Sequence, residues 1–146
     1  MLNQIDIQNI ITIAKEAGGA IMQIYKQDFE VEYKQDSSPL TLADKRANDI
    51  IEDGLDQLSI NFPILSEEGK DIPYEERRYW EYFWLVDPLD GTKEFVKKNG
   101  EFTVNIALIH KDTPVLGVVY APALDICYWA KQGEGAFKDG QRLPLK

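Results

Sequence analysis

The chain has 146 residues, of which 44% are hydrophobic and 28% are charged, and its formal net charge is −9. This length and composition predict one soluble globular domain with a single core. The negative charge argues against a surface built to bind a nucleic-acid polymer, which needs basic patches. It does not exclude a small phosphorylated substrate, because a bound metal ion can make the local charge positive. The single cysteine, Cys127, excludes an intramolecular disulfide and is expected to be a buried, inert thiol.

The first part of the sequence predicts two helices. Apolar residues at helical spacing indicate an amphipathic helix over residues 4–27, in which Gly18-Gly19 either weakens the helix or lets a neighbour approach closely. Residues 29–34 alternate as in a strand, and a second helix is predicted to begin near Thr41 and to end before Pro63. The chain shows no basic-then-apolar leader and no apolar run of membrane-spanning length, so we expect a cytoplasmic protein.

The second part predicts consecutive strands joined by turns. A short apolar run at 64–65 and a polar exposed loop over 70–78 precede these strands. Strands are predicted over 79–86, 102–109, 115–120 and 126–130, followed by a hairpin near the end of the chain. Together these elements predict an α+β fold in which two N-terminal helices pack on an antiparallel sheet.

The stretch 84–95, Trp-Leu-Val-Asp-Pro-Leu-Asp-Gly-Thr-Lys-Glu-Phe, predicts a metal and phosphate site. An apolar strand leads into Asp87 and Asp90 around a proline turn, and two neighbouring buried carboxylates need a compensating cation. Such oxygen ligands suit Mg²⁺, and the N–H groups of Gly91 and Thr92 at a helix start can receive an anion. Surface turn aspartates are the alternative for these residues alone, and the preceding strand with the following Gly-Thr favours the metal site.

A second apolar run ends in carboxylates at 65–69, Leu-Ser-Glu-Glu-Gly. Successive strand side chains point to opposite faces, so at most one of Glu67 and Glu68 would point at a shared metal. A solvated acidic turn is the alternative, but two strands in one domain that each end in acidic residues favour a two-metal site. Asp44 is expected in the first turn of the second helix, where the helix dipole favours acidic residues. Thr92 is either a cap residue or a group that orients a water molecule.

These two stretches resemble the metal motifs of the lithium-sensitive, magnesium-dependent phosphatases. That superfamily includes inositol monophosphatase, fructose-1,6-bisphosphatase and the 3′(2′),5′-bisphosphate nucleotidases. Thr-Lys-Glu-Phe at 92–95, continued by Asn-Gly-Glu-Phe-Thr-Val-Asn-Ile-Ala-Leu at 99–108, is similar to the nucleotidase branch, whereas inositol monophosphatases typically carry Thr-Thr-Asn-Phe. The resemblance implies hydrolysis of adenosine 3′,5′-bisphosphate to AMP and phosphate in sulfate assimilation. An inositol monophosphatase-type activity is the alternative.

The resemblance also implies a role for each residue that matches the motifs. The implied ligands of two or three Mg²⁺ ions are Glu67, Asp87, the carbonyl of Leu89, and Asp90. Li⁺ is the implied inhibitor of the enzyme. The implied substrate-binding residues are Glu67, Leu89, Asp90, Gly91 and Thr92. The implied catalytic residues are Asp44, Thr92 and Glu68, with Asp44 and Thr92 together orienting the attacking water. The mechanism would be direct in-line attack by metal-activated water, without a phosphoenzyme.

The resemblance covers only the N-terminal portion of such enzymes. Family members continue into an α/β domain with a further aspartate ligand in a Trp-Asp-x-Ala-Ala-Gly-like motif, which this sequence lacks. We therefore expect residues 1–146 to be a truncated N-terminal metal- and phosphate-binding domain, with a non-catalytic metal- or anion-binding domain as the alternative to an enzyme. The expected partner is a small phosphorylated nucleotide. A second copy of the chain and the periphery of the inner membrane are further candidates.

Overall fold

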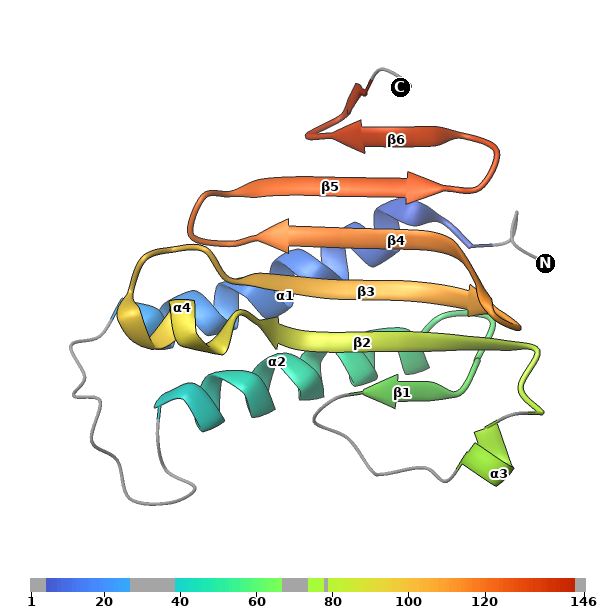
Figure 1. Ribbon diagram of the computed structural model, residues 1–146, viewed down its shortest axis with the longest axis horizontal. Coiled ribbons are helices and arrows are strands. Elements are labelled where there is room, and N and C mark those ends of the chain that lie inside the picture. Colours follow the sequence, from blue (N-terminus) through green and yellow to red (C-terminus); the bar gives the residue numbers. More distant parts are fainter. Residues whose placement is uncertain (1–4, 27–38, 67–73, 78, 144–146) are drawn as a thin grey trace.

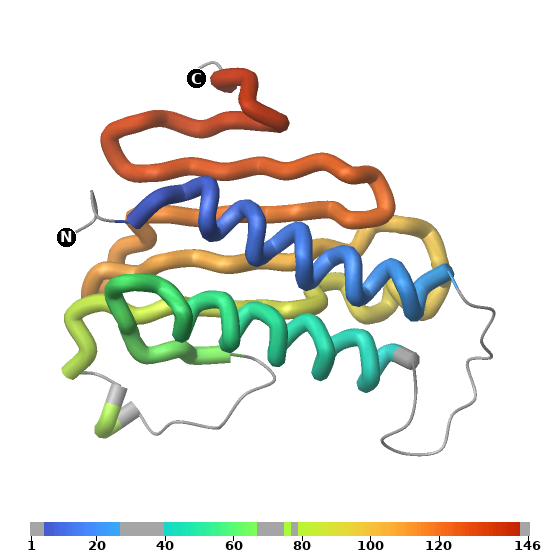
Figure 2. The backbone as a smooth tube through the Cα atoms, turned by 180° about the vertical axis from the view of Figure 1, so that it is seen from behind, coloured from blue at the N-terminus to red at the C-terminus, as the bar shows by residue number. Residues whose placement is uncertain are grey.

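A seven-stranded sheet covered on one face by two helices forms the centre of the molecule (Figures 1 and 2). The structure is a computed structural model that describes residues 5–26, 39–66, 74–77 and 79–143. The helices are α1 (Ile7–Tyr25), α2 (Pro39–Asp56), α3 (Tyr74–Arg77) and α4 (Thr92–Lys97). The strands are β1 (Ile64–Ser66), β2 (Tyr82–Asp90), β3 (Thr103–His110), β4 (Thr113–Ala121), β5 (Ile126–Lys131), β6 (Gly135–Lys138) and β7 (Gln141–Arg142). They lie side by side in chain order.

The predicted α+β class is confirmed, and the sheet differs from the prediction at one edge. From β2 to β7 every neighbouring pair is antiparallel, but β1 pairs with β2 in parallel, with Ser66 beside Val86. A parallel pair needs a long crossover connection, and residues 67–81 provide that length, whereas an antiparallel pair can be joined by a tight turn. The prediction of a purely antiparallel sheet is therefore wrong for β1.

Several element boundaries also differ from the predicted ones. α2 begins at Pro39, where proline's fixed φ suits the first helical position, and part of the predicted polar loop forms α3. β2 continues through the predicted proline turn to Asp90. A β-bulge after Asp87 accommodates Pro88, which has no N–H to donate, and pairing with β3 resumes at Asp90. The strand predicted over 29–34 lies outside the described residues.

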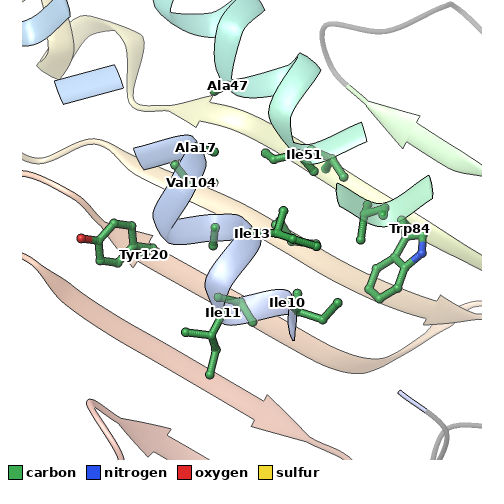
Figure 3. Close-up of a cluster of buried hydrophobic side chains, with 14 of the residues drawn as sticks. Ile10, Ile11, Ile13, Ala17, Ala47, Ile51, Trp84, Val104 and Tyr120 are labelled. Carbon is green, nitrogen blue, oxygen red and sulfur yellow. The ribbon is translucent and has the colours of Figure 1, made fainter. Parts of the chain in front are cut away.

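Aliphatic side chains of α1 and α2 pack on the sheet and form the core. Ile10 and Ile21 of α1, Ile51 of α2 and Trp84 of β2 are fully buried. Figure 3 shows the two helices meeting above the strands, with labelled side chains from both helices and from the sheet. No helix in the described part of the chain is both long and apolar enough to cross a membrane.

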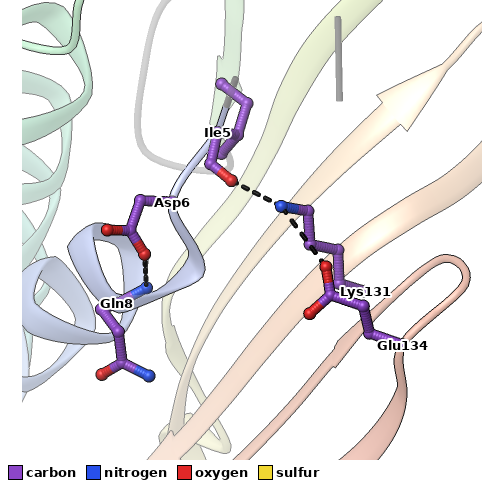
Figure 4. Close-up of polar contacts among 5 residues, drawn as sticks. All are labelled: Ile5, Asp6, Gln8, Lys131 and Glu134. Carbon is purple, nitrogen blue, oxygen red and sulfur yellow. Dashed lines mark hydrogen bonds and ion pairs between the residues drawn. The ribbon is translucent and has the colours of Figure 1, made fainter. Parts of the chain in front are cut away.

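The start of α1 is held by two polar contacts (Figure 4). Asp6 is the N-cap, and its carboxylate accepts a hydrogen bond of 3.0 Å from the backbone N–H of Gln8. The Lys131 ammonium of β5 donates to the carbonyl oxygen of Ile5 at 2.6 Å and lies 3.8 Å from a carboxylate oxygen of Glu134. The Asp6 contact caps the first turn of α1, and the contact of Lys131 with Ile5 fixes the residue before this cap to β5.

Gly18 and Gly19 are neighbours in α1 but face different surroundings. A Cβ atom at Gly18 would lie 2.6 Å from Cε2 of the Tyr120 ring and 3.0 Å from Cβ of Pro122, whereas one at Gly19 would meet no atom within 4 Å. We expect Gly18→Ala to lower the free energy of unfolding by about 1–3 kcal/mol, because the added methyl group must displace the Tyr120 ring and Pro122. Gly19→Ala should raise it by about 0.5–1 kcal/mol, since alanine favours the helix.

Urea unfolding followed by circular dichroism measures both changes. Of the two alternatives that the sequence left open, the close approach of a neighbour thus applies to Gly18, which lies against β4. Equal changes for the two variants would contradict this assignment, because they would show that α1 tolerates a side chain equally at both positions.

Candidate functional site

The described residues among those singled out in the sequence lie toward one end of the sheet. β1 and β2 are parallel neighbours and run toward the same end of the sheet. Ser66, the last residue of β1, pairs with Val86, and β2 continues to Asp90. α4 follows β2 directly, and the start of α2 lies at the same end in both views (Figures 1 and 2). α2 and α4 are in contact. The predicted site residues that are described therefore come from elements that converge.

The end of β1 is tied to α2 by buried polar groups. The Ser66 hydroxyl donates a short hydrogen bond to Oδ1 of Asn48, and Nδ2 of Asn48 donates to Oε2 of Glu52 at 2.8 Å. Ser66 and Asn48 are both buried. This network fixes the last described residue of β1 relative to α2. Glu67 and Glu68 follow it in the chain and lie outside the described residues, so their predicted roles stay predictions.

A β-bulge shapes the end of β2. Asp87 is the register partner of Asn105, and Asp90 is the partner of Thr103, so three steps along β2 match two steps along β3. Pro88 and Leu89 have no partner in this ladder, and both side chains are buried. The bulge therefore removes the Leu89 backbone from regular pairing and leaves Asp87 half-buried and Asp90 exposed. We call residues 87–92 together with Asn105 the carboxylate corner.

Asn105 contacts the carboxylate corner from β3. Its Nδ2 donates to Oδ2 of Asp90 at 3.0 Å. An ionised carboxylate only accepts hydrogen bonds, so the amide NH₂ must face Asp90 and the amide oxygen must face elsewhere. That oxygen, Oδ1 of Asn105, is buried and accepts no hydrogen bond from the described residues. A buried acceptor without a donor costs about 1–3 kcal/mol, so this point is suited to a water molecule or another donor.

Asp87 and Asn105 also line a cleft of about 290 Å³. The alternation of strand side chains places this cleft on the sheet face opposite α1 and α2, because Trp84 and Val86 of β2 are buried on the helix side. The cleft gives the carboxylate corner an open side on which a ligand can approach.

Gly91 and Thr92 begin α4, as predicted. Gly91 is the N-cap residue, with φ 92° and ψ 50°, in the left-handed region that favours glycine. A Cβ atom at this position would lie 3.2 Å from the carbonyl oxygen of Glu101 and 3.2 Å from Cα of Phe102. The tight turn between β2 and α4 therefore depends on a residue without a side chain.

α4 has only six residues and is held in place by Phe95. Phe95 is fully buried, and its ring centroid lies 5.5 Å from that of Tyr25 and 5.4 Å from that of Phe102. The backbone N–H of Phe95 donates to the carbonyl oxygen of Gly91 at 3.0 Å. Core packing thus fixes the orientation of the helix start that carries Thr92.

Asp44 lies in the second turn of α2, so its prediction as a first-turn residue is wrong. The helix begins at Pro39, and its first turn contains no acidic residue. The helix dipole favours acidic residues mainly in the first turn. It therefore explains the presence of an aspartate at position 44 less well than the sequence suggested. The side chain is half-buried, and its Oδ1 atom is buried. Its predicted pairing with Thr92 stays a prediction.

The chemistry of the carboxylate corner fits a hard divalent cation. Mg²⁺ is usually held by one or two carboxylates together with water and phosphate oxygens. The corner offers the carboxylates of Asp87 and Asp90 and the buried amide oxygen of Asn105. Within the described ranges, no three His, Cys, Asp or Glu side chains lie close enough to hold a metal by themselves. The ligand set Glu67, Asp87, Leu89 and Asp90 stays a prediction.

Two other titratable side chains, Cys127 and His110, lie away from this corner. Cys127 of β5 is buried, and burial raises the pKa of its thiol, which agrees with the expected inert cysteine. His110 ends β3 beside the start of β2, at the end of the sheet opposite Asp90. Its ring stacks on Tyr82 with centroids 4.3 Å apart, and its Nε2 lies 3.3 Å from Oε2 of Glu81. Neither residue adds to the carboxylate corner.

Comparison with known proteins identifies the family. The profile of the inositol monophosphatase family matches residues 3–146. The chain belongs to this family. It is 53% identical over 130 residues to the 3′(2′),5′-bisphosphate nucleotidase CysQ of Salmonella typhimurium, an alignment that covers 88% of this chain and 52% of that protein. The resemblance based on the two motifs is confirmed.

Solved structures of family members have the same fold. The crystal structure of CysQ from Bacteroides thetaiotaomicron matches with a TM-score of 0.84 and 46% identity, over 95% of this chain and 50% of that chain. A structure of SaIMPase-II with bound 2′AMP matches with a TM-score of 0.75 and 33% identity, over 94% of this chain and 49% of that chain. The chain thus spans about half the length of the relatives that it matches.

The sequence did not point to Asn105. In the alternating pattern of β3 it occupies an outward position, where a polar residue is ordinary. The one available signal was that the strands predicted over 79–86 and 102–109 follow each other in an antiparallel sheet. The register that brings the Asn105 and Asp90 side chains together also includes a bulge. The contact therefore became evident only from the structure.

Proposed function

We propose that this chain carries the metal- and phosphate-binding residues of a magnesium-dependent phosphomonoester hydrolase. Its substrate would be adenosine 3′,5′-bisphosphate, which loses the 3′-phosphate to give AMP and phosphate. The observation that carries the proposal is the bulged end of β2, which presents Asp87 and Asp90 beside the glycine-started helix α4. The nucleotidase name of the CysQ relatives and the 2′AMP bound to SaIMPase-II support a nucleotide phosphate as substrate.

The reaction consumes one water molecule. A bond forms between phosphorus and the water oxygen, the bond from phosphorus to the 3′-oxygen breaks, and that oxygen takes up a proton. When bound, Mg²⁺ would neutralise charge on the phosphate and lower the pKa of water. Two or three Mg²⁺ ions would be held by Glu67, Asp87, the carbonyl of Leu89, and Asp90. Li⁺ would inhibit the enzyme.

The remaining residues would position the substrate and the water. The backbone N–H groups of Gly91 and Thr92 would donate to phosphate oxygens, because the first N–H groups of a helix have no partner within it. The Thr92 hydroxyl would donate to the carboxylate of Asp44 and accept from the attacking water, which orients the water toward phosphorus. Glu68 would act as an outer carboxylate of the site.

The proposal also includes the setting of the reaction. We place it in the cytoplasm, in sulfate assimilation, where adenosine 3′,5′-bisphosphate must be removed. Homodimer formation and association with the periphery of the inner membrane stay predictions. A nucleic-acid polymer is not a partner on this proposal, because the chain has a net charge of −9.

Phosphate release tests the proposed function. The 146-residue chain, and any longer reading frame that contains it, is assayed with adenosine 3′,5′-bisphosphate and with inositol 1-phosphate, in the presence of Mg²⁺ or EDTA. We expect faster release from the nucleotide, complete loss with EDTA and inhibition by Li⁺. Preference for inositol 1-phosphate would assign the inositol monophosphatase-type alternative. Mg²⁺ binding without turnover in every form would assign the non-catalytic alternative.

A further inference from the structure

We propose that Asn105 is a positioning residue for the Asp90 carboxylate. The inference rests on the proposed function and adds a residue to it that the two metal motifs do not contain. The amide group of Asn105 holds one oxygen of Asp90, so that the other oxygen would have a fixed direction for binding a cation. Three features of the described residues support this role.

The first feature is the position of the contact. Asp90 is the last residue of β2, it follows the bulge, and its side chain is exposed, so its own backbone restricts the carboxylate little. Asn105 lies within β3, which is paired on both sides, with Asp87 as its partner in β2 and Val119 as its partner in β4. The hydrogen bond from Nδ2 of Asn105 to Oδ2 of Asp90 therefore ties an exposed carboxylate to a strand that is paired on both sides.

The second feature is the charge of the group that holds Asp90. An amide donates a hydrogen bond without carrying a positive charge, so Asp90 keeps its full negative charge for a cation. A lysine or arginine at the same place would compete with that cation. Outer partners of this kind orient the carboxylates that bind metals.

The third feature is the unsatisfied oxygen of Asn105. Oδ1 is buried and accepts no hydrogen bond from any described residue, although buried polar groups in folded proteins are generally paired. Asparagine is also disfavoured in strands, where a β-branched residue would pack better. A β-branched residue would therefore suit the strand better than asparagine, whereas the hydrogen bond to Asp90 accounts for an amide at this position.

Asn105→Val tests the inference, because valine suits a strand and removes only the amide. Mn²⁺ serves as the probe, and its binding to the 146-residue chain is followed by electron paramagnetic resonance. We expect the dissociation constant for Mn²⁺ to rise about 10- to 100-fold in Asn105→Val. The urea midpoint should stay the same or rise. Val119→Thr, on the neighbouring strand and the same face, is the matched control and should bind Mn²⁺ like the wild type.

The side-chain amide signals of Asn105 provide a readout that needs no metal. In the wild type they should exchange slowly with solvent, and in Asp90→Ala they should shift and exchange quickly, because the hydrogen bond is lost. Unchanged signals in Asp90→Ala would overturn the inference. Wild-type affinity for Mn²⁺ in Asn105→Val would overturn it as well while leaving the proposed function in place. Failure of the wild type to bind Mn²⁺ would overturn both.

Discussion

Asp90→Asn is expected to reduce magnesium-dependent phosphate release from adenosine 3′,5′-bisphosphate by at least about 10²-fold, in the form of the protein that shows turnover. The substitution removes one of the two described carboxylates of the corner while it keeps the shape of the side chain. Asparagine can turn its carbonyl oxygen toward Nδ2 of Asn105, so the hydrogen bond between the two strands persists. Because Asp90 is exposed, the free energy of unfolding should change by less than about 0.5 kcal/mol.

Initial rates, calorimetric titration with Mg²⁺ and thermal unfolding together measure this result. Asp112→Asn is the matched control, because it removes the same charge from the turn between β3 and β4. That turn lies at the end of the sheet opposite Asp90. If both variants lost activity equally, the loss would come from net charge and not from a ligand. Near-normal turnover in Asp90→Asn would remove Asp90 from the proposed metal site.

Local patterns in the sequence were sufficient for most of the fold. The helical spacing of apolar residues predicted α1 and α2, alternation predicted β3, and runs bounded by turn residues predicted β4 and β5, each strand to within a few residues. These features depend on residues close together in the chain. The start of α2 also had a local signal, since Ser-Ser-Pro at 37–39 combines residues typical of a helix cap and of the first helical position.

Pairings between distant segments could not be predicted in the same way. The parallel placement of β1 beside β2 depends on the path of residues 67–81, and no periodicity in β1 records the direction of its neighbour. The contact of Asn105 with Asp90 depends on the register of β3 and on a bulge that Pro88 permits. The motif thus indicated which residues lie together at the end of β2, while the partner on β3 followed only from the register.

Gly91→Ala is expected to disrupt the carboxylate corner through the backbone. Alanine is strained at the φ of 92° found here, and its Cβ atom would lie 3.2 Å from backbone atoms of Glu101 and Phe102, which cannot rotate away. We expect the free energy of unfolding to fall by about 1–3 kcal/mol. The start of α4 must also shift, so KM for adenosine 3′,5′-bisphosphate should rise as the N–H groups of residues 91 and 92 lose their alignment. Urea unfolding and steady-state kinetics measure the two effects.

Gly133→Ala separates the two causes of this loss. Gly133 has a similar φ of 87°, but a Cβ atom there would meet no atom within 4 Å, so this variant has the conformational strain without the backbone contacts. The stability difference between Gly91→Ala and Gly133→Ala therefore measures the cost of the close approach at the carboxylate corner. Gly133 lies in the turn between β5 and β6, so its variant should keep the wild-type KM. Equal stability losses in the two variants would show that the turn into α4 adapts to a side chain. An unchanged KM in Gly91→Ala would show that the phosphate contacts assigned to Gly91 and Thr92 do not depend on the geometry of this turn.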